Sequence, residues 1–163
     1  MTIKFFKSIS YKEIIMTAVG SISGIGGIAL LGFLTNHPFI IAPFGANAVL
    51  LYSATSSPLA QPKNVCLGHL ISAVIAITCN LILPSSWYTM AIAVTLAIIA
   101  MMLTDTLHPP GGATALLCVI QDVKSFTFLI SPLALGIAII LVSATLSSKI
   151  FPGVRPYPYR KKD

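Results

Sequence analysis

The sequence predicts an all-α protein that crosses a lipid bilayer several times. Of its 163 residues, 56% are hydrophobic and only 9% are charged, whereas a soluble domain carries roughly a quarter charged residues. Runs of about 20 apolar residues, the length that spans the hydrocarbon core of a bilayer, recur along the chain. We therefore expect a single polytopic transmembrane domain over residues 1–163.

Basic residues gather at both ends of the chain, which has a net charge of +6. A basic segment over residues 1–12 precedes the first apolar run, and a basic, proline-rich tail over residues 151–163 follows the last. Positive residues flank membrane spans on the cytoplasmic side. The chain is therefore expected in the inner (plasma) membrane of a bacterial cell with both termini cytoplasmic, and no nucleic acid is expected as a partner. The basic residues near the two ends are Lys4, Lys7, Lys12, Lys149, Arg155, Arg160, Lys161 and Lys162.

Four strong spans are expected, over residues 13–34, 64–83, 87–104 and 128–150. In the first, Gly20, Gly24 and Gly27 form a small-residue face that allows close helix contact, and we expect a second copy of the chain to pack partly on it. Pro84 separates the second span from the third, and Pro152 ends the last.

The second span carries a stripe of polar and small residues at helical spacing. Residues of this kind line a transport pathway in some helices and bond one helix to another in others, and the sequence leaves both interpretations open. The members of the stripe are His69, Ser72, Ala73, Ala76 and Asn80.

Two further segments, residues 37–54 and 103–120, are apolar but short and are interrupted by proline and glycine. They resemble each other, because PFGANAVL at residues 43–50 falls on PGGATALL at residues 110–117 after a shift of 110 − 43 = 67 residues. If both segments are re-entrant, the chain has four spans and a parallel repeat. If both cross, it has six short spans in two inverted halves. Segment length favours four spans, and the position of Lys63 relative to the basic termini favours six.

Each interrupted segment has the pattern of a helix that starts inside the membrane. Proline breaks a helix that enters from before but is tolerated in the first turn of a new one. Such a start leaves backbone N–H groups unpaired and carries a partial positive charge, which suits an anion. The alternative is that proline and glycine only kink two short helices for packing. The expected binding residues are Pro43, Phe44, Gly45, Ala46, Asn47, His108, Pro109, Pro110, Gly111, Gly112, Ala113 and Thr114.

Ionisable residues inside a membrane segment are costly and are candidates for function. For Asp105 and His108, a role in capping and orienting the helix start and a role in proton coupling both remain open. Because a carboxylate repels an anion, we place Asp105 in a second layer or a pathway around the site, together with His69, Ser72 and Asn80.

Catalysis and metal binding are not expected. The three cysteines, Cys66, Cys79 and Cys118, have no metal-ligand spacing. No nucleophile stands at a motif spacing beside Asp105 and His108. We therefore expect a protein that is not an enzyme and that uses no cofactor and no metal.

The motif HPPGGATALL at residues 108–117 closely resembles the signature of the HPP family of integral membrane proteins. Two other blocks of that family are also similar: APFGANAVL at residues 42–50, and SPLAQPKN at residues 57–64 followed by Gly68 and His69. The resemblance covers residues 13–150. It implies four transmembrane helices and, from plant chloroplast and cyanobacterial members, transport of nitrite or a related small anion.

The function expected from these patterns is a transporter or channel for a small monovalent inorganic anion, with nitrite as the first candidate, held at the N-termini of the two interrupted helices. The alternative is a membrane assembly or sensor subunit that transports nothing. Four to six short spans make a thin bundle that hardly encloses a water-lined path, so we expect a homo-oligomer, either a dimer or a trimer.

Overall fold

A computed structural model describes residues 9–159, and every regular element in that range is helical. Lys4, Lys7, Arg160, Lys161 and Lys162 lie outside the described residues. The α-helices are α1 (Tyr11–Thr35), α2 (Ala42–Ser53), α3 (Pro62–Ile82), α4 (Trp87–Leu103), α5 (Pro109–Ile120) and α6 (Leu135–Ile150). Shorter helical turns are η1 (Pro58–Ala60), η2 (Phe126–Leu129) and η3 (Ile130–Ala134). The expected all-α fold is confirmed for the described residues.

Three helical stretches are long and apolar enough to cross a membrane: α1, α3 and Phe126–Ile150, which contains α6. The third expected span forms α4, which at 17 residues is somewhat short, and α5 is a shorter apolar helix. The number of crossings therefore stays a prediction.

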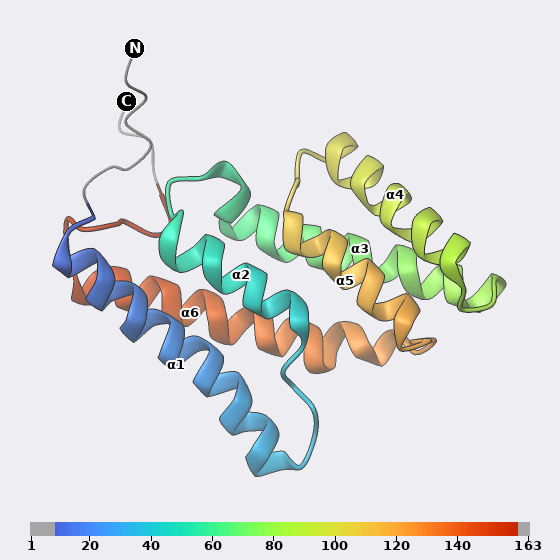
Figure 1. Cartoon of the computed structure of the whole chain (residues 1–163), viewed down its shortest axis with the longest axis horizontal. Helices are drawn as coiled ribbons and strands as arrows, with labels where there is room; N and C mark the ends of the chain where they lie inside the picture. The colour runs from blue at the N-terminus through green and yellow to red at the C-terminus, as the bar shows by residue number, and fades with distance from the viewer. Residues whose placement is uncertain (1–8, 160–163) are drawn as a thin grey trace.

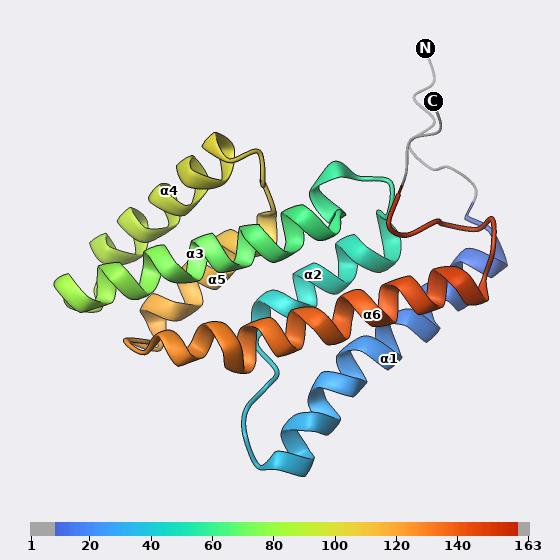
Figure 2. The same cartoon turned by 180° about the vertical axis from the view of Figure 1, so that it is seen from behind.

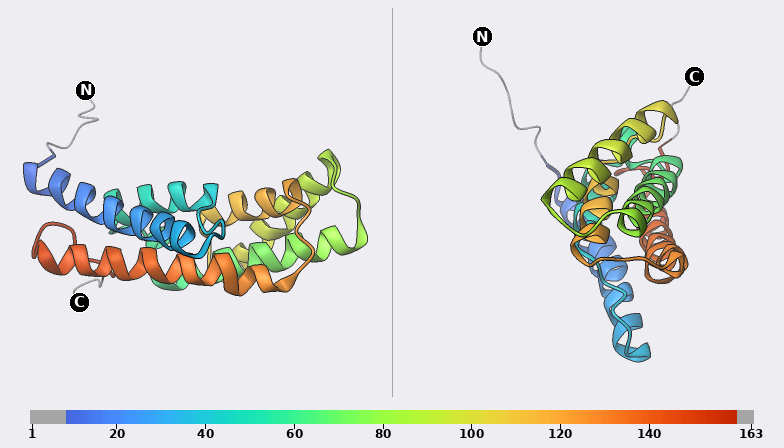
Figure 3. Two further views of the ribbon diagram at one scale, coloured as in Figure 1. Left: turned by 90° about the horizontal axis from the view of Figure 1, so that it is seen from below. Right: turned by 90° about the vertical axis from the view of Figure 1, so that its right-hand side faces the viewer.

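Successive helices alternate in direction along the long axis of the molecule (Figures 1 and 2). The start of α1 and the end of α6 lie at the same end. Seen from below, α3 and α6 form one layer, and α1, α2 and α5 form another (Figure 3). α2 packs on α1, α5 and α6, whereas α5 packs on α2, α3 and α4. This alternation agrees with the six-segment, inverted arrangement better than with a parallel repeat.

The small-residue face of α1 is occupied within the chain. A Cβ atom built on Gly20 would lie 2.6 Å from the Tyr52 ring, and one built on Gly27 would lie 3.3 Å from Ile139 of α6. The Tyr52 hydroxyl, at the same face, donates to Ser143 Oγ at 3.1 Å. The expectation that a second copy packs on this face is therefore wrong, because α2 and α6 already fill it.

The segment after α6 folds back over the ends of the other helices. Arg155 Nε lies 3.0 Å from Glu13 Oε1 at the start of α1, and the Tyr157 hydroxyl donates to the Ala60 carbonyl at 2.8 Å. Burial raises the pKa of Tyr157. The tail therefore ties α1, η1 and α6 together at the end of the molecule where α1 begins.

Candidate functional site at two proline-started helices

α2 and α5 are equivalent in length and in the placement of their matched residues. Each has 12 residues, and the shift of 67 carries Ala42–Ser53 onto Pro109–Ile120. Pro43 and Pro110 both stand second in their helices, and Asn47 and Thr114 both stand sixth. Both helices begin near the middle of the molecule and run toward opposite ends (Figures 1 and 2). The proline and glycine pattern therefore marks two helix starts, as the sequence predicts.

Few backbone N–H groups at these starts are available to a ligand. In α5 the first two residues are prolines, which have no N–H, and Gly111 N donates to the His108 carbonyl at 2.8 Å. In α2 the second residue is proline, and Phe44 N donates to the Ile41 carbonyl at 3.0 Å. An anion would therefore be attracted mainly by the partial positive charge of the helix ends and by nearby side chains, not by backbone N–H groups.

Two buried histidines meet beside the start of α5. His108 Nε2 lies 3.3 Å from His69 Nε2, and the ring centroids are 4.8 Å apart. At the far side of His69, Nδ1 lies 2.7 Å from the Thr114 hydroxyl. At the far side of His108, Nδ1 lies 2.8 Å from the Leu59 carbonyl oxygen. A continuous hydrogen-bonded chain thus runs from α5 through α3 to η1, and His69, His108 and Thr114 are fully buried.

Two glycines bring α3 and α5 close enough for this chain to form. A Cβ atom built on Gly111 would lie 2.8 Å from the Gly68 carbonyl oxygen, and one built on Gly68 would lie 2.5 Å from His108 Cβ. Both are closer than real Cβ contacts. Gly68 was not among the expected site residues, although it directly precedes His69 in a block typical of the family.

Asn47 is the polar residue of the site that lacks a partner. Its side chain is fully buried, and neither amide atom has a hydrogen-bond partner in the part of the chain that the structure describes. Phe44, one helical turn earlier, places its ring edge-on to His69 at a centroid distance of 6.1 Å. The face of α2 that carries Phe44 and Asn47 therefore adjoins the histidine pair.

The expected binding residues divide into a buried and an accessible group. Pro43, Phe44, Asn47, His108, Pro110, Gly111 and Thr114 are buried, whereas Gly45, Ala46 and Pro109 are exposed and Gly112 and Ala113 are half-buried. Cβ atoms built on Gly45 and Gly112 meet no described atom within 4 Å beyond their own helical turns. The accessible group therefore forms an open side of the two helices.

Asp105 does not pair with His108. It has a φ of 51°, its side chain is 99% exposed, and its carboxylate lies 3.2 Å from Lys63 Nζ at the start of α3. The left-handed turn after α4 directs the Asp105 carboxylate to the surface, away from His108, and no side chain caps the start of α5 among the described residues.

Ser72 and Asn80 have packing roles in this structure. Ser72 Oγ would lie 3.0 Å from a Cβ atom on Gly111, so it belongs to the close contact of α3 with α5. Asn80 Nδ2 donates to the Cys118 carbonyl at 2.8 Å and to the Val123 carbonyl at 3.0 Å. Asn80 therefore holds the C-terminal end of α5, and the polar stripe serves interhelical bonding at this position.

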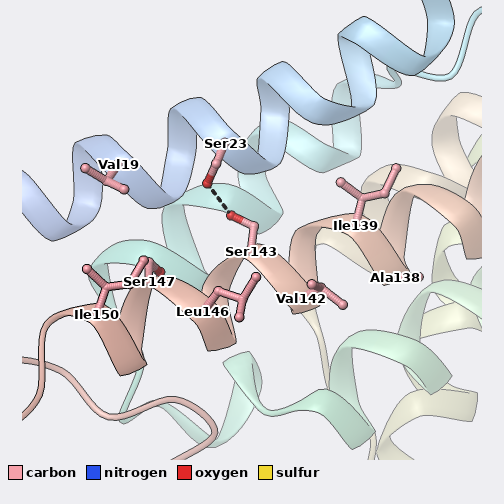
Figure 4. A pocket seen from close by; sticks show the side chains of 9 residues that line it. All are labelled: Val19, Ser23, Ala138, Ile139, Val142, Ser143, Leu146, Ser147 and Ile150. Atoms are coloured by element: carbon pink, nitrogen blue, oxygen red, sulfur yellow. Dashed lines mark hydrogen bonds between the residues drawn. The ribbon is translucent and has the colours of Figure 1, made fainter.

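A largely apolar groove of about 490 Å³ lies between α1 and α6 (Figure 4). It shares no residue with the site, and two of its three serines, Ser23 and Ser143, bond to each other (Figure 4). Within residues 9–159, no group of three histidine, cysteine or acidic side chains is placed to hold a metal ion. The candidate site is therefore the junction of α2, α3 and α5.

Comparison with known proteins places the chain in a family. The family model described as HPP, transmembrane region, matches residues 6–158. Two transmembrane proteins of Dictyostelium discoideum are each 37% identical to the chain, in alignments of 161 and 158 residues that each cover 90% of this chain. The chain spans about half the length of these relatives, 50% of one and 55% of the other. No solved structure matches it. The match to the family model over residues 6–158 shows that this chain belongs to the HPP family of transmembrane proteins.

Proposed function

We propose that this protein is a transporter of a small monovalent anion, with nitrite as the first candidate, and that it is not an enzyme. The proposed path passes the starts of α2 and α5. The buried, unpartnered amide of Asn47 carries the proposal. The family membership supports a membrane function, and the resemblance to nitrite-transporting members supports the choice of anion.

An unpaired amide inside a membrane protein is costly. Leaving a buried polar group without a hydrogen bond costs about 1–3 kcal/mol, and such groups call for a specific explanation. A ligand that accepts a hydrogen bond from Asn47 Nδ2 removes part of this cost while it is bound. An anion with several oxygens, such as nitrite, offers such an acceptor.

The electrostatics of the junction favour an anion over a cation. The N-terminal ends of α2 and α5 each carry a partial positive charge of about half a unit. Asp105, the acid nearest to the start of α5 in the sequence, is exposed and lies against Lys63. The buried residues around the junction are otherwise neutral or histidine, so an entering anion meets no buried carboxylate among the described site residues.

A second copy of the chain is part of the proposal. The open side formed by Gly45, Ala46, Pro109, Gly112 and Ala113 leaves the helix starts uncovered in a single chain. A water-filled path needs protein walls, because lipid cannot satisfy polar groups. We propose that a dimer or trimer supplies the missing wall at this side. We also propose that both termini lie in the cytoplasm, because basic residues flank the first and last spans.

The test is anion flux into liposomes that contain the purified full chain, compared among nitrite, nitrate, formate and chloride. Replacing Asn47 with leucine keeps the branching and the number of heavy atoms of the side chain and removes the unpaired amide. We expect Asn47→Leu to melt at the same or a higher temperature than the wild type but to carry the anion at least tenfold more slowly.

The matched control is Thr78→Val. It also replaces a polar side chain on a membrane helix, but the Thr78 hydroxyl bonds only to the Val74 carbonyl of its own helix. This variant is expected to transport like the wild type. Asn47→Leu with wild-type flux would contradict the proposed site, and absence of flux for all four anions would favour the assembly or sensor role.

A further inference from the structure

The histidine pair offers a binding site for a proton beside the anion path. Its hydrogen bonds fix which ring nitrogens carry hydrogen. A backbone carbonyl only accepts, so His108 Nδ1 must donate to the Leu59 oxygen, 2.8 Å away. In a neutral ring the other nitrogen is then an acceptor. His108 Nε2 therefore accepts from His69 Nε2 at 3.3 Å.

The same reasoning continues to Thr114. With hydrogen on Nε2, neutral His69 accepts at Nδ1, and the Thr114 hydroxyl must donate to it across 2.7 Å. The single hydroxyl hydrogen of Thr114 is used in that bond. The Pro110 carbonyl, which lies 3.2 Å from the same hydroxyl oxygen, then receives nothing from it. The neutral chain thus runs in one direction, from Thr114 to Leu59.

One added proton fits this geometry without moving a heavy atom. The proton is taken up from water and binds His69 Nδ1. The new Nδ1–H group then donates to the Thr114 oxygen, and the Thr114 hydroxyl donates its own hydrogen to the Pro110 carbonyl. The bonds from His69 to His108 and from His108 to Leu59 are unchanged. A second proton would require N–H groups on both Nε2 atoms, facing each other across 3.3 Å. The pair therefore accommodates one proton but not two.

We propose that His69 and His108 bind a single proton that is transported together with the anion. This proposal rests on the proposed transport function and adds the second substrate. The bound proton places a positive charge beside the Phe44 ring, on the face of α2 that also carries Asn47. It also turns the Thr114 hydroxyl hydrogen from His69 to the Pro110 carbonyl. Binding of the anion and binding of the proton then favour each other, because opposite charges attract strongly in a poorly solvated site.

None of the neighbouring groups among the described residues replaces the two histidines as the site that gains the proton. The charged groups at the starts of α3 and α5, Lys63 and Asp105, are exposed and paired with each other. Met101 of α4 and Phe44 of α2 are neutral neighbours. The remaining titratable groups on the described α2, α3, α4 and α5 are tyrosines and cysteines, whose protonated forms carry no charge: Tyr52, Cys66, Cys79, Tyr88 and Cys118.

The first experiment measures the proton directly. The chain contains three histidines, so the full-length His37→Gln protein, labelled with ¹⁵N-histidine in lipid nanodiscs, reports on the pair alone. Above neutral pH we expect hydrogen on Nδ1 of His108 and on Nε2 of His69. On acidification we expect uptake of one proton by the two rings together. The reverse tautomers, uptake of two protons, or no uptake before unfolding would each overturn the proposal.

The second experiment measures coupling in liposomes loaded with a pH-sensitive dye. Nitrate and chloride are used as probes, because their strong parent acids do not carry protons through the lipid. An imposed inward gradient of the probe should acidify the lumen of wild-type vesicles. His69→Gln still has an amide to donate to His108 but cannot take up a proton, so acidification should fall at least tenfold. His37→Gln, an exposed histidine outside the site, should behave like the wild type.

The two experiments separate the two proposals. Flux of nitrate or chloride without acidification in wild-type vesicles would overturn proton coupling and leave anion transport standing. One-proton uptake in the nanodiscs with no flux of any tested anion would remove the transport function and, with it, the role of the proton as a transported substrate. Acidification by His69→Gln at the wild-type rate would also overturn the assignment.

Discussion

The two equivalent helices, α2 and α5, pack on their neighbours in different ways. α5 meets α3 through two glycines, Gly111 and Gly68, and its sixth residue belongs to a complete hydrogen-bonded chain. At the position of α2 that matches Gly111 stands Phe44, whose ring fills the space above Gly136 of α6. The sixth residue of α2, Asn47, has no partner among the described residues.

This difference indicates that two similar helix starts have taken on different tasks. At α5, close backbone contact with α3 accompanies a hydrogen-bonded chain that includes Thr114. At α2, a bulky ring and an unsatisfied amide leave bonding capacity for something from outside the chain. Each of these helices also packs on the last helix of the other half, α2 on α6 and α5 on α3, so the two tasks meet at one junction.

The comparison of α2 with α5 depends most on the two halves of the chain having opposite orientations in the membrane. Single cysteines at positions 63 and 124, in a background without the three native cysteines, should be labelled from opposite sides of oriented vesicles. The cysteine at position 63 should react with reagent added on the cytoplasmic side, the side on which the termini are expected. Labelling of both positions from one side would instead support four spans and re-entrant α2 and α5.

Gly111→Val should have the largest effect on folding. A Cβ atom there would lie 2.8 Å from backbone of α3, which cannot move aside as a flexible side chain can. We expect a loss of about 3 kcal/mol or more in stability. The measurement is the yield of monodisperse protein and its melting temperature in mild detergent; a wild-type melting temperature would mean that α3 and α5 are further apart than described.

Gly112→Val, one residue later, should fold but transport poorly. No described atom beyond its own turn lies within 4 Å of the added Cβ, so the chain itself accommodates the new side chain. If an anion or the second copy occupies that space, flux should fall at least tenfold at matched membrane expression. Wild-type flux would mean that the open side of α5 faces only lipid and that the accessible half of the site is wrong.

Thr114→Val should have a moderate effect, because it removes one hydroxyl and keeps the shape. Loss of one neutral hydrogen bond costs on the order of 1 kcal/mol, which corresponds to a several-fold decrease in apparent anion affinity. The affinity is read from the concentration dependence of flux. An unchanged affinity, with unchanged histidine tautomers, would remove Thr114 from the chain that links the two substrates.

Asp105→Asn should have the smallest effect. The pair with Lys63 is exposed, and exposed ion pairs contribute about 0–1 kcal/mol. We expect a melting temperature within a few degrees of the wild type and flux within about twofold. A loss of proton-driven uptake in this variant alone would transfer the coupling role from the histidine pair to Asp105.

The features predicted correctly from the sequence are those that depend on local chemistry. The first expected span forms α1, although a reciprocal cap in which Ser10 N donates to Glu13 at 2.8 Å starts the helix two residues before residue 13. The prolines place the starts of α2 and α5. Each of these signals lies within a few residues of the feature that it predicts.

The features that the sequence did not predict depend on contacts between distant segments. His69 and His108 are 39 residues apart, and the packing of α3 on α5, which the glycine contact permits, brings them together. The glycines of α1 showed that a close neighbour was needed, but not that this neighbour was Tyr52 of the same chain. Helical spacing identifies the face of a helix that packs, whereas the partner of that face is decided by the whole fold.

The limit of one proton on the histidine pair has a consequence for energetics. Moving one elementary charge across a membrane requires about 2.3 kcal/mol for each 100 mV of potential. A monovalent anion that crosses with one proton moves no net charge. Its accumulation would then follow the pH difference alone, and a cell could change its membrane voltage without driving this anion in or out.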